Sequence, residues 1–283
     1  MYFPPGFNVE RAIELAELVI QAYAQFDAFL KDVPWKPTGG YTLVRVLTYV
    51  PTSKATIARG QFLSFESRGF HLSGDRERRG VPMGFVAERN RDLFIIFRGT
   101  LTAGEWIRNF NIDLVPYLLP GYGQVHRGFL QTYMLFQDAI MESVESRGSR
   151  RAVLVGGHSL GGALSTLAVP DLARKLTGGA PLFYSFGSPR VGDNGFVQSF
   201  NRHLRGRSFR VVNTSDIVGS IPFPAPIVGV LGGYFSHVDT PVDFTVQHDD
   251  LEKNHDMQTY LSALRASCGR KGILGALSRM PAR

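Results

Sequence analysis

The sequence predicts an α/β protein built on a mostly parallel sheet with helices on both of its faces. Short apolar runs alternate along the chain with segments in which apolar residues recur at helical spacing. The runs 152–156, 182–186 and 209–213 are almost continuously apolar, which is typical of strands buried on both faces. Strands that alternate with helices favour a parallel sheet covered on each side.

The elements can be placed in chain order from their spacing and their boundary residues. Asn8 is a favourable N-cap, and the apolar residues after it recur at helical spacing over about residues 9–30. Proline and glycine residues then end this helix. Pro170 is expected to interrupt the helix that begins near residue 160 or to restart a second one. The further elements expected are strands at 84–87 and 93–97 with a turn at 90–92, and helices at 105–113, 128–147 and 160–176.

Length and composition favour a single domain over residues 1–283. One hydrophobic core can grow to about 250–300 residues, and no repeat, low-complexity segment or linker divides the chain. The net charge is +7, but no aromatic-interleaved basic repeat and no zinc-ligand spacing occur. Nucleic-acid binding is therefore not expected, and neither a metal nor a cofactor is implied. The oligomeric state is not indicated, and a monomer is the simplest expectation.

Cellular location is only weakly indicated. No segment approaches about 18 consecutive apolar residues, so no transmembrane segment is expected. The first residues lack a basic region followed by an apolar run, so no signal peptide is visible. Secretion with a removed leader and a cytoplasmic location both stay open. The single cysteine, Cys268, excludes an intrachain disulfide and favours a bacterial or intracellular origin.

Ser159 lies where a strand passes directly into a helix, in the stretch Gly157-His158-Ser159-Leu160-Gly161. A G-x-S-x-G turn in this context holds its serine in strained backbone geometry, with the hydroxyl above the sheet. Glycines two residues before and after the serine remove β-carbons that would clash in so sharp a turn. The alternative is a structural turn with an incidental serine. The context favours Ser159 as a catalytic nucleophile.

Five motifs in a fixed order give the sequence a wider resemblance. They are Phe97-Arg98-Gly99-Thr100, Val125-His126-Arg127-Gly128-Phe129, Gly157 to Leu164, Phe186 to Gly192 and Arg210 to Val218. With these motifs the sequence resembles the class 3 lipases, the group that includes the fungal triacylglycerol lipases. The resemblance covers roughly residues 80–260. It implies an α/β-hydrolase fold with a short helical lid and a serine-dependent ester hydrolase.

The resemblance also implies the partners of the serine. In α/β hydrolases the acid and then the histidine follow the serine along the chain. Asp216, just after a buried strand, stands where the family carries its acid, and His255 stands in the family's final histidine segment. His237 matches a family position near the site that is not the base, and His248 is expected at the surface. His126 and His158 are expected in supporting roles.

Two backbone N–H groups are needed for the oxyanion of an acyl transfer. Leu160, directly after the nucleophile, is expected to supply one of them. Thr100 matches the family's second donor, and its hydroxyl can contribute as well. A plain helix N-cap is the alternative role for Thr100, and the two roles are compatible.

The segment 101–114 occupies the place of the family's lid. Trp106, Ile107 and Phe110 give it an apolar stripe that suits a cover opening at a lipid surface. A surface helix with a permanently buried apolar face explains the stripe equally well. The apolar loop 221–231 is expected to border the acyl-chain pocket or to pack in the core.

These observations predict a carboxylic-ester hydrolase, in first place a triacylglycerol lipase or esterase that acts on ester lipids at a lipid–water interface. The family also contains phospholipases A1 and feruloyl esterases, which remain alternatives. A non-catalytic lipid-binding protein on the same fold is a further alternative. The sequence departs from the family at Gly219, where proline is usual after Asp-Ile-Val, and at Pro170.

Overall fold

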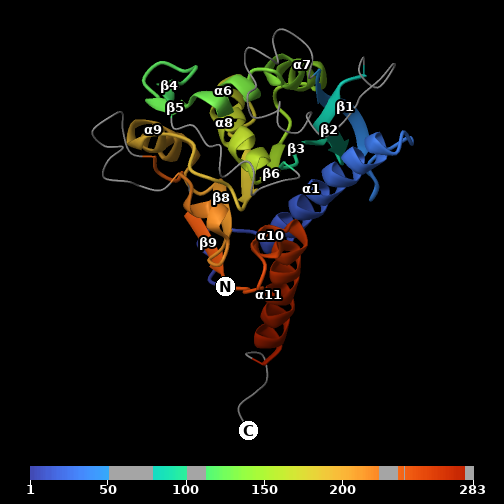
Figure 1. Cartoon of the computed structure of the whole chain (residues 1–283), viewed down its shortest axis with the longest axis vertical. Coiled ribbons are helices and arrows are strands. Elements are labelled where there is room, and N and C mark those ends of the chain that lie inside the picture. Colours follow the sequence, from blue (N-terminus) through green and yellow to red (C-terminus); the bar gives the residue numbers. More distant parts are fainter. Residues whose placement is uncertain (51–78, 101–112, 223–234, 239, 278–283) are drawn as a thin grey trace.

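The computed structural model describes residues 1–50, 79–100, 113–222, 235–238 and 240–277, with side chains described to residue 268. Its centre is a seven-stranded sheet in the order β1-β2-β3-β6-β7-β8-β9 (Figure 1). These strands are β1 (Thr42–Tyr49), β2 (Val81–Arg89), β3 (Asp92–Phe97), β6 (Val153–His158), β7 (Leu182–Phe186), β8 (Ser208–Asn213) and β9 (Thr240–Phe244). Neighbours are parallel from β3 to β9, whereas β1, β2 and β3 are antiparallel. The prediction of a mostly parallel sheet is confirmed.

Helices cover both faces of this sheet (Figure 1). One face packs against α1 (Val9–Leu30) and α11 (Met257–Leu277), which also contact each other. The other face packs against α6 (Arg127–Tyr133), α7 (Gln137–Arg147), α8 (Leu160–Lys175) and α9 (Asn194–Leu204). The remaining elements are the small sheet of β4 (Leu114–Pro116) and β5 (Gln124–His126), the 3-10 helix η1 (Ile217–Ser220) and α10 (Leu251–His255).

The apolar sequence of β3 explains why the sheet needs both layers. Phe94 and Ile96 are buried in the cluster that contains α1, whereas Ile95 and Phe97 are buried in the cluster of the opposite face. Successive side chains of a strand point to opposite sides, so a continuous apolar run places hydrophobic groups on both. Each face can leave water only under its own layer of helices.

Helix α1 begins and is anchored as its sequence predicts. The side chain of Asn8 accepts a hydrogen bond from the Arg11 backbone N–H at 2.9 Å, which caps the first turn. The Tyr184 hydroxyl of β7 also accepts from the Asn8 N–H at 3.0 Å and donates to the Asn8 carbonyl at 3.2 Å. This end of α1 is thereby fixed to the middle of the sheet.

Two predicted helices differ from the expectation. The expected helix 128–147 is divided into α6 and α7, because the chain turns so that buried Phe136 packs against Phe97 with ring centroids 5.7 Å apart. The prediction that Pro170 interrupts its helix is wrong, since α8 runs through it without a break. Every residue of α8 from Leu160 to Leu172 is buried. Such packing outweighs the roughly 3 kcal/mol that an internal proline costs.

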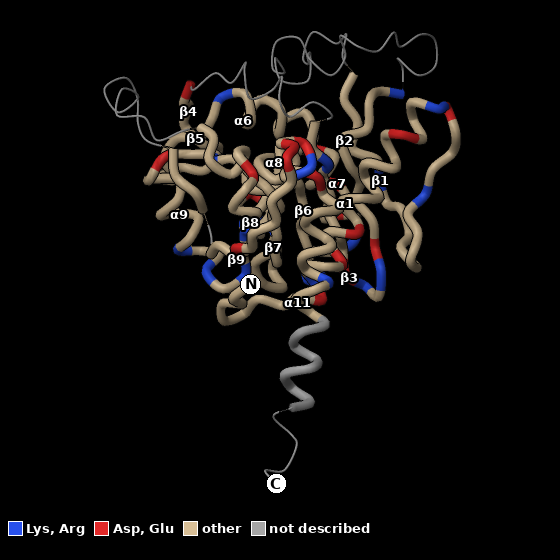
Figure 2. Tube along the Cα trace, turned by 60° about the horizontal axis from the view of Figure 1, so that its bottom comes forward, with Lys and Arg blue, Asp and Glu red and all other residues tan. Residues whose placement is uncertain are grey.

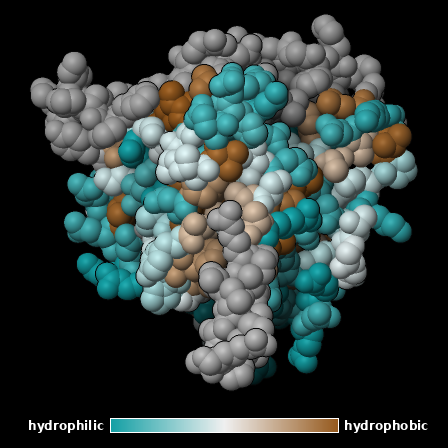
Figure 3. All heavy atoms as spheres, turned by 90° about the horizontal axis from the view of Figure 1, so that it is seen from below, coloured by the Kyte–Doolittle hydropathy of each residue, from teal (hydrophilic) through white to brown (hydrophobic). Residues whose placement is uncertain are grey.

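The surface of the described part mixes charge and hydropathy. Figure 2 shows basic and acidic residues interspersed along the chain, so in that view the positive net charge is not gathered in one patch. In Figure 3 hydrophilic residues predominate on the face around α11, and the most apolar residues stand in small groups. Among the helices that the structure describes, none is long and apolar enough to cross a bilayer.

Gly84 provides a test of the β2–β3 pairing. A Cβ at this position would lie 1.9 Å from the Ile96 carbonyl oxygen, so the two strands would have to separate. We expect Gly84→Ala to lower the free energy of unfolding by about 2–4 kcal/mol in urea denaturation followed by circular dichroism. Gly219→Ala is the control, because its nearest neighbour would be 3.7 Å away. Equal stabilities of the two variants would contradict the packing described.

Candidate active site

Ser159 occupies a strained junction between β6 and α8. Its φ is 55° and its ψ is −126°, a backbone conformation that residues other than glycine rarely adopt. The close approach of the surrounding backbone explains the two glycines of the motif. A Cβ at Gly157 would lie 2.2 Å from the Gly161 carbonyl oxygen, and one at Gly161 would lie 2.3 Å from the Arg98 carbonyl oxygen. Only glycine fits at either position.

The turn after β3 lies against the serine. A Cβ at Gly99 would be 2.7 Å from the Cβ of Ser159. Arg98 is completely buried beneath this turn, where its Nη1 donates to the Gly99 carbonyl at 2.7 Å and its Nε to the Pro82 carbonyl at 2.9 Å. Its guanidinium also lies 4.0 Å from the ring centroid of Phe26. These contacts fix the turn next to Ser159, and therefore also the position of Thr100, the residue after Gly99.

Asp216 and His255 form a buried pair. Asp216 follows β8 by three residues and caps η1, its Oδ1 accepting from the Val218 N–H at 2.9 Å. Its Oδ2 accepts from His255 Nδ1 at 2.6 Å and from the Tyr260 hydroxyl at 2.6 Å. Burial and the Asp216 carboxylate raise the pKa of Tyr260 well above its ordinary value, so this group remains a donor. The carboxylate is thus fully hydrogen-bonded inside the protein.

The imidazole of His255 is oriented by this pair. Because Nδ1 donates to the carboxylate, the neutral ring carries its lone pair on Nε2. Nε2 is buried without a hydrogen-bond partner among the described residues, and so is Oγ of Ser159. The backbone of α10 is held in turn by Asn213, whose Nδ2 donates to the Asn254 carbonyl at 3.0 Å. A serine–histidine hydrogen bond would join the two unpartnered atoms, Ser159 Oγ and His255 Nε2.

His158 lies beside His255 and has both ring nitrogens hydrogen-bonded. Its Nε2 donates to the His255 carbonyl at 2.7 Å, and its Nδ1 accepts from the Tyr23 hydroxyl at 2.7 Å. Burial and the neighbouring His255 lower the pKa of His158 well below its ordinary value. The ring is therefore neutral, with its proton on Nε2.

Three other histidines weighed in the sequence analysis, His126, His237 and His248, have partners elsewhere. His126 caps α6 by accepting from the Phe129 N–H at 3.2 Å, in the supporting role expected for it. His237 is bonded through Nε2 to the Gly219 carbonyl at 2.6 Å, next to η1. Burial, followed by the charge of Arg210, lowers its pKa to about 3. His248 is half-buried, and its Nε2 lies 3.3 Å from Thr259 Oγ1.

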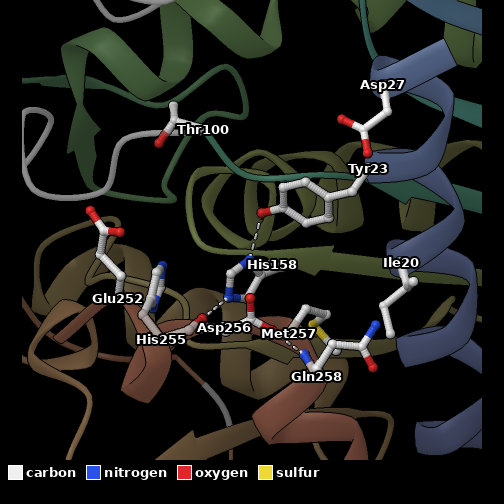
Figure 4. Close-up of a pocket in the computed structure, with 10 residues that line it drawn as sticks. All are labelled: Ile20, Tyr23, Asp27, Thr100, His158, Glu252, His255, Asp256, Met257 and Gln258. Carbon is white, nitrogen blue, oxygen red and sulfur yellow. Dashed lines mark hydrogen bonds between the residues drawn. The ribbon is translucent and has the colours of Figure 1, made fainter. Parts of the chain in front are cut away.

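A pocket of about 350 Å³ lies beside His158 and His255 (Figure 4). Thr100, His158 and His255 contribute to its wall, and Thr100 Oγ1 is buried without a partner among the described residues. Its other lining residues are Ile20, Tyr23, Asp27, Glu252, Asp256, Met257 and Gln258. No group of three or more histidine, cysteine, aspartate or glutamate side chains in the described segments is placed to hold a metal ion. The residues Trp106, Ile107 and Phe110 lie outside the described residues.

Sequence reasoning missed two tyrosines at this site. Tyr23 belongs to the apolar stripe of α1 and therefore looks like an ordinary core residue in the sequence. Tyr260 follows His255 by five residues, and only the start of α11 brings its hydroxyl to Asp216. Both were detectable only as aromatic residues with a polar end, which usually find a partner when buried.

Comparison with known proteins agrees with this geometry. Residues 94–225 match the family model of the class 3 lipases. Over this segment the chain is similar to the class 3 lipases. The matched range includes the Ser159 junction, the turn at Thr100 and Asp216, whereas α1 and His255 lie outside it.

The chain has curated relatives whose names give different activities. It is 28% identical over 269 residues to phospholipase A1 EG1 of Oryza sativa subsp. indica, covering 81% of the chain and 59% of the relative. It is 32% identical over 178 residues to secreted mono- and diacylglycerol lipase 1 of Fusarium solani, covering 60% of the chain and 49% of the relative. The chain thus spans about half the length of the curated relatives it matches.

A solved structure shares the fold. The chain superposes on the lipase propeptide complex of Rhizomucor miehei with a TM-score of 0.59 and 22% identity, covering 84% of this chain and 69% of the other. The α/β-hydrolase fold expected from the sequence is confirmed by this likeness.

Buried neutral histidines predict how stability depends on pH. His158 and His237 have lowered pKa values in the folded protein, so they bind protons more readily when unfolded. Below the unfolded value near 6.5 the unfolded state gains protons, and each of the two lowers the free energy of unfolding by about 1 kcal/mol per pH unit. His237→Gln should therefore flatten the dependence between pH 6.5 and 5.

Urea denaturation at several pH values measures this slope. Glutamine at position 237 retains an N–H donor for the Gly219 carbonyl but does not titrate. His203→Gln is the control, since His203 is an exposed residue at the end of α9. A slope that changes equally in both variants would refute the role given to His237.

Proposed function

We propose that the protein is a serine carboxylic-ester hydrolase in which Ser159 is the nucleophile, His255 the base and Asp216 the acid that orients it. One observation carries this proposal. A serine in strained geometry and a histidine oriented by a buried carboxylate leave Oγ and Nε2, the two atoms needed for proton transfer, buried and unpartnered. A structural role leaves such a strained, unsatisfied arrangement unexplained.

The reaction follows from these positions. Ser159 Oγ attacks the ester carbonyl carbon while its proton passes to His255 Nε2, and the Asp216 carboxylate stabilises the imidazolium through Nδ1–H. The tetrahedral intermediate then collapses, and Nε2–H gives its proton to the departing alkoxide. Water attacks the resulting acyl-enzyme with the same base, releasing the carboxylic acid and restoring the serine.

The negative oxygen of the intermediate needs donors on one side of the serine. Leu160 supplies the first, since its N–H lies at the N-terminus of α8, where helix N–H groups are unused and the dipole is positive. The Thr100 N–H and hydroxyl supply the second from the turn packed against Ser159. Each such donor contributes roughly 3–4 kcal/mol to the transition state.

Ester lipids are the proposed substrates, and neutral acylglycerols come first among them. Relatives of the chain carry names of mono- and diacylglycerol lipase and of phospholipase A1, so both substrate classes are candidates. The carboxylates of Asp27, Glu252 and Asp256 line the pocket, and none of its described lining residues is lysine or arginine. In Figure 4 Asp27 and Glu252 stand on opposite sides of His158. This acidic rim favours neutral esters over anionic phospholipids.

Two further features complete the proposal. The segment 101–114, with Trp106, Ile107 and Phe110, serves as a lid that opens at a lipid–water interface. The whole chain, residues 1–283, forms a single catalytic domain.

The nucleophile can be tested with a phosphonate probe and two serine variants. The probe should label Ser159, and Ser159→Ala should lower kcat for a p-nitrophenyl ester by about 10⁴- to 10⁶-fold. Ser208→Ala is the matched control, because Ser208 is equally buried but begins β8 at the opposite end of that strand from Asp216. Labelling at another residue, or a loss of less than tenfold in Ser159→Ala, would refute the assignment.

The acidic rim can be tested by removing one of its charges. Glu252→Gln should raise kcat/KM for an ester with a terminal carboxylate about two- to threefold relative to its neutral methyl-capped analogue, as expected for one exposed charge near the site. Glu142→Gln is the control, since Glu142 pairs with Arg45 on the opposite face of the sheet. An unchanged ratio in Glu252→Gln would contradict the electrostatic selection.

A further inference from the structure

We propose that Tyr23 is a positioning residue that ties the turn carrying Thr100 to the base His255 through the side chain of His158. This inference rests on the proposed function, because it concerns how the parts of that site are held together. Tyr23 comes from α1, before the range that matches the family model, and in Figure 4 it reaches from that helix toward His158.

A continuous chain of hydrogen bonds carries the proposal. The Gly99 N–H donates to the Tyr23 hydroxyl oxygen at 2.9 Å. The Tyr23 hydroxyl donates to His158 Nδ1 at 2.7 Å, and His158 Nε2 donates to the His255 carbonyl at 2.7 Å. The direction is fixed at both ends, because an amide N–H can only donate and a carbonyl can only accept. The Tyr23 hydroxyl and the neutral His158 ring each accept one hydrogen bond and donate the next one in the chain.

The first bond acts on the proposed oxyanion donor. Gly99 immediately precedes Thr100, and a Cβ on Gly99 would lie 2.6 Å from the Tyr23 hydroxyl and 2.7 Å from Ser159 Cβ. The turn is thus packed between the tyrosine and the nucleophile. Loss of the hydroxyl frees the Gly99 amide, and a shift of about 1 Å in a catalytic group is enough to slow a reaction strongly.

The last bond acts on the base. His158 and His255 have ring centroids 4.5 Å apart, and the Tyr260 ring packs edge-on to His158 with centroids 5.9 Å apart. When His255 takes the serine proton, a second charge on His158 would oppose it. The Tyr23 hydroxyl occupies His158 Nδ1 as a donor, so it favours the neutral ring beside the imidazolium.

A simpler role for Tyr23 is to anchor α1 to the sheet, and the chain offers a matched control for that role. Tyr184 also binds α1 through its hydroxyl, but at Asn8, the other end of the helix, away from the pocket. Tyr184→Phe and Tyr23→Phe each remove one oxygen and leave one backbone N–H without its partner, that of Asn8 and that of Gly99 respectively.

The kinetics of the two variants separate positioning from anchoring. For Tyr23→Phe we expect kcat for a p-nitrophenyl ester and the rate of phosphonate labelling to fall roughly 10- to 100-fold, with KM changed less than about twofold. Tyr184→Phe should keep kcat within about threefold while losing similar stability in urea. A kcat for Tyr23→Phe within threefold of that for Tyr184→Phe would overturn the positioning role.

Nitrogen-15 NMR of the histidine rings in the full chain gives a readout that does not need activity. His158 should hold one proton on Nε2 and should not titrate between pH 5 and 8, and Tyr23→Phe should shift its Nδ1 resonance toward that of an unbonded nitrogen. A proton on Nδ1 in the unchanged protein would overturn the chain of bonds. If the unchanged protein neither hydrolyses esters nor reacts with the phosphonate, the proposed function fails instead.

Discussion

The site depends on the close contact of three backbone segments that meet without β-carbons. The turn at Gly99, the end of β6 at Gly157 and the first turn of α8 at Gly161 approach one another so closely that a methyl group at any of them would meet an atom within 2.7 Å. This contact holds Ser159 at its positive φ, which costs about 1–3 kcal/mol. The buried strand before it and the wholly buried start of α8 supply that energy.

Around this contact, the polar side chains that surround the proposed reacting atoms are held by hydrogen bonds. Asp216 is saturated by three donors, His255 is oriented by Asp216, and His158 is held between Tyr23 and the His255 backbone. Arg98 fixes the neighbouring turn from beneath. Rigidity of this kind is what a preorganised site needs, because groups that are already oriented need not rearrange during the reaction.

Most of the central sheet and the junction at Ser159 could be predicted from the sequence, because buried strands are strongly apolar and this junction requires glycines at fixed spacing. The edge strands β1 and β9 were not predicted, since each has only two buried residues and a weak apolar pattern. Pro170 was misjudged because burial around α8 outweighs the local preference of proline.

The pairing of Asp216 with His255 was expected from the resemblance, but its supporting residues were not. Tyr23 and Tyr260 join the site through hydroxyl groups on helices from opposite ends of the chain. Such contacts depend on how α1 and α11 pack, which no local pattern records. The sequence therefore identified the groups proposed to react better than the groups that hold them.

The separation of these parts along the chain also bears on biosynthesis. Gly157 to Gly161 are synthesised before β7, whose Phe186 carbonyl accepts a hydrogen bond from the Ser159 N–H. They also precede α10 and α11, which bring the donors His255 and Tyr260 to Asp216. Strand β9, which covers the edge of β8, is equally late. The proposed nucleophile is thus synthesised well before the proposed base, and the two can meet only after α10 has been made. A long-range order of assembly of this kind is typical of slow folding.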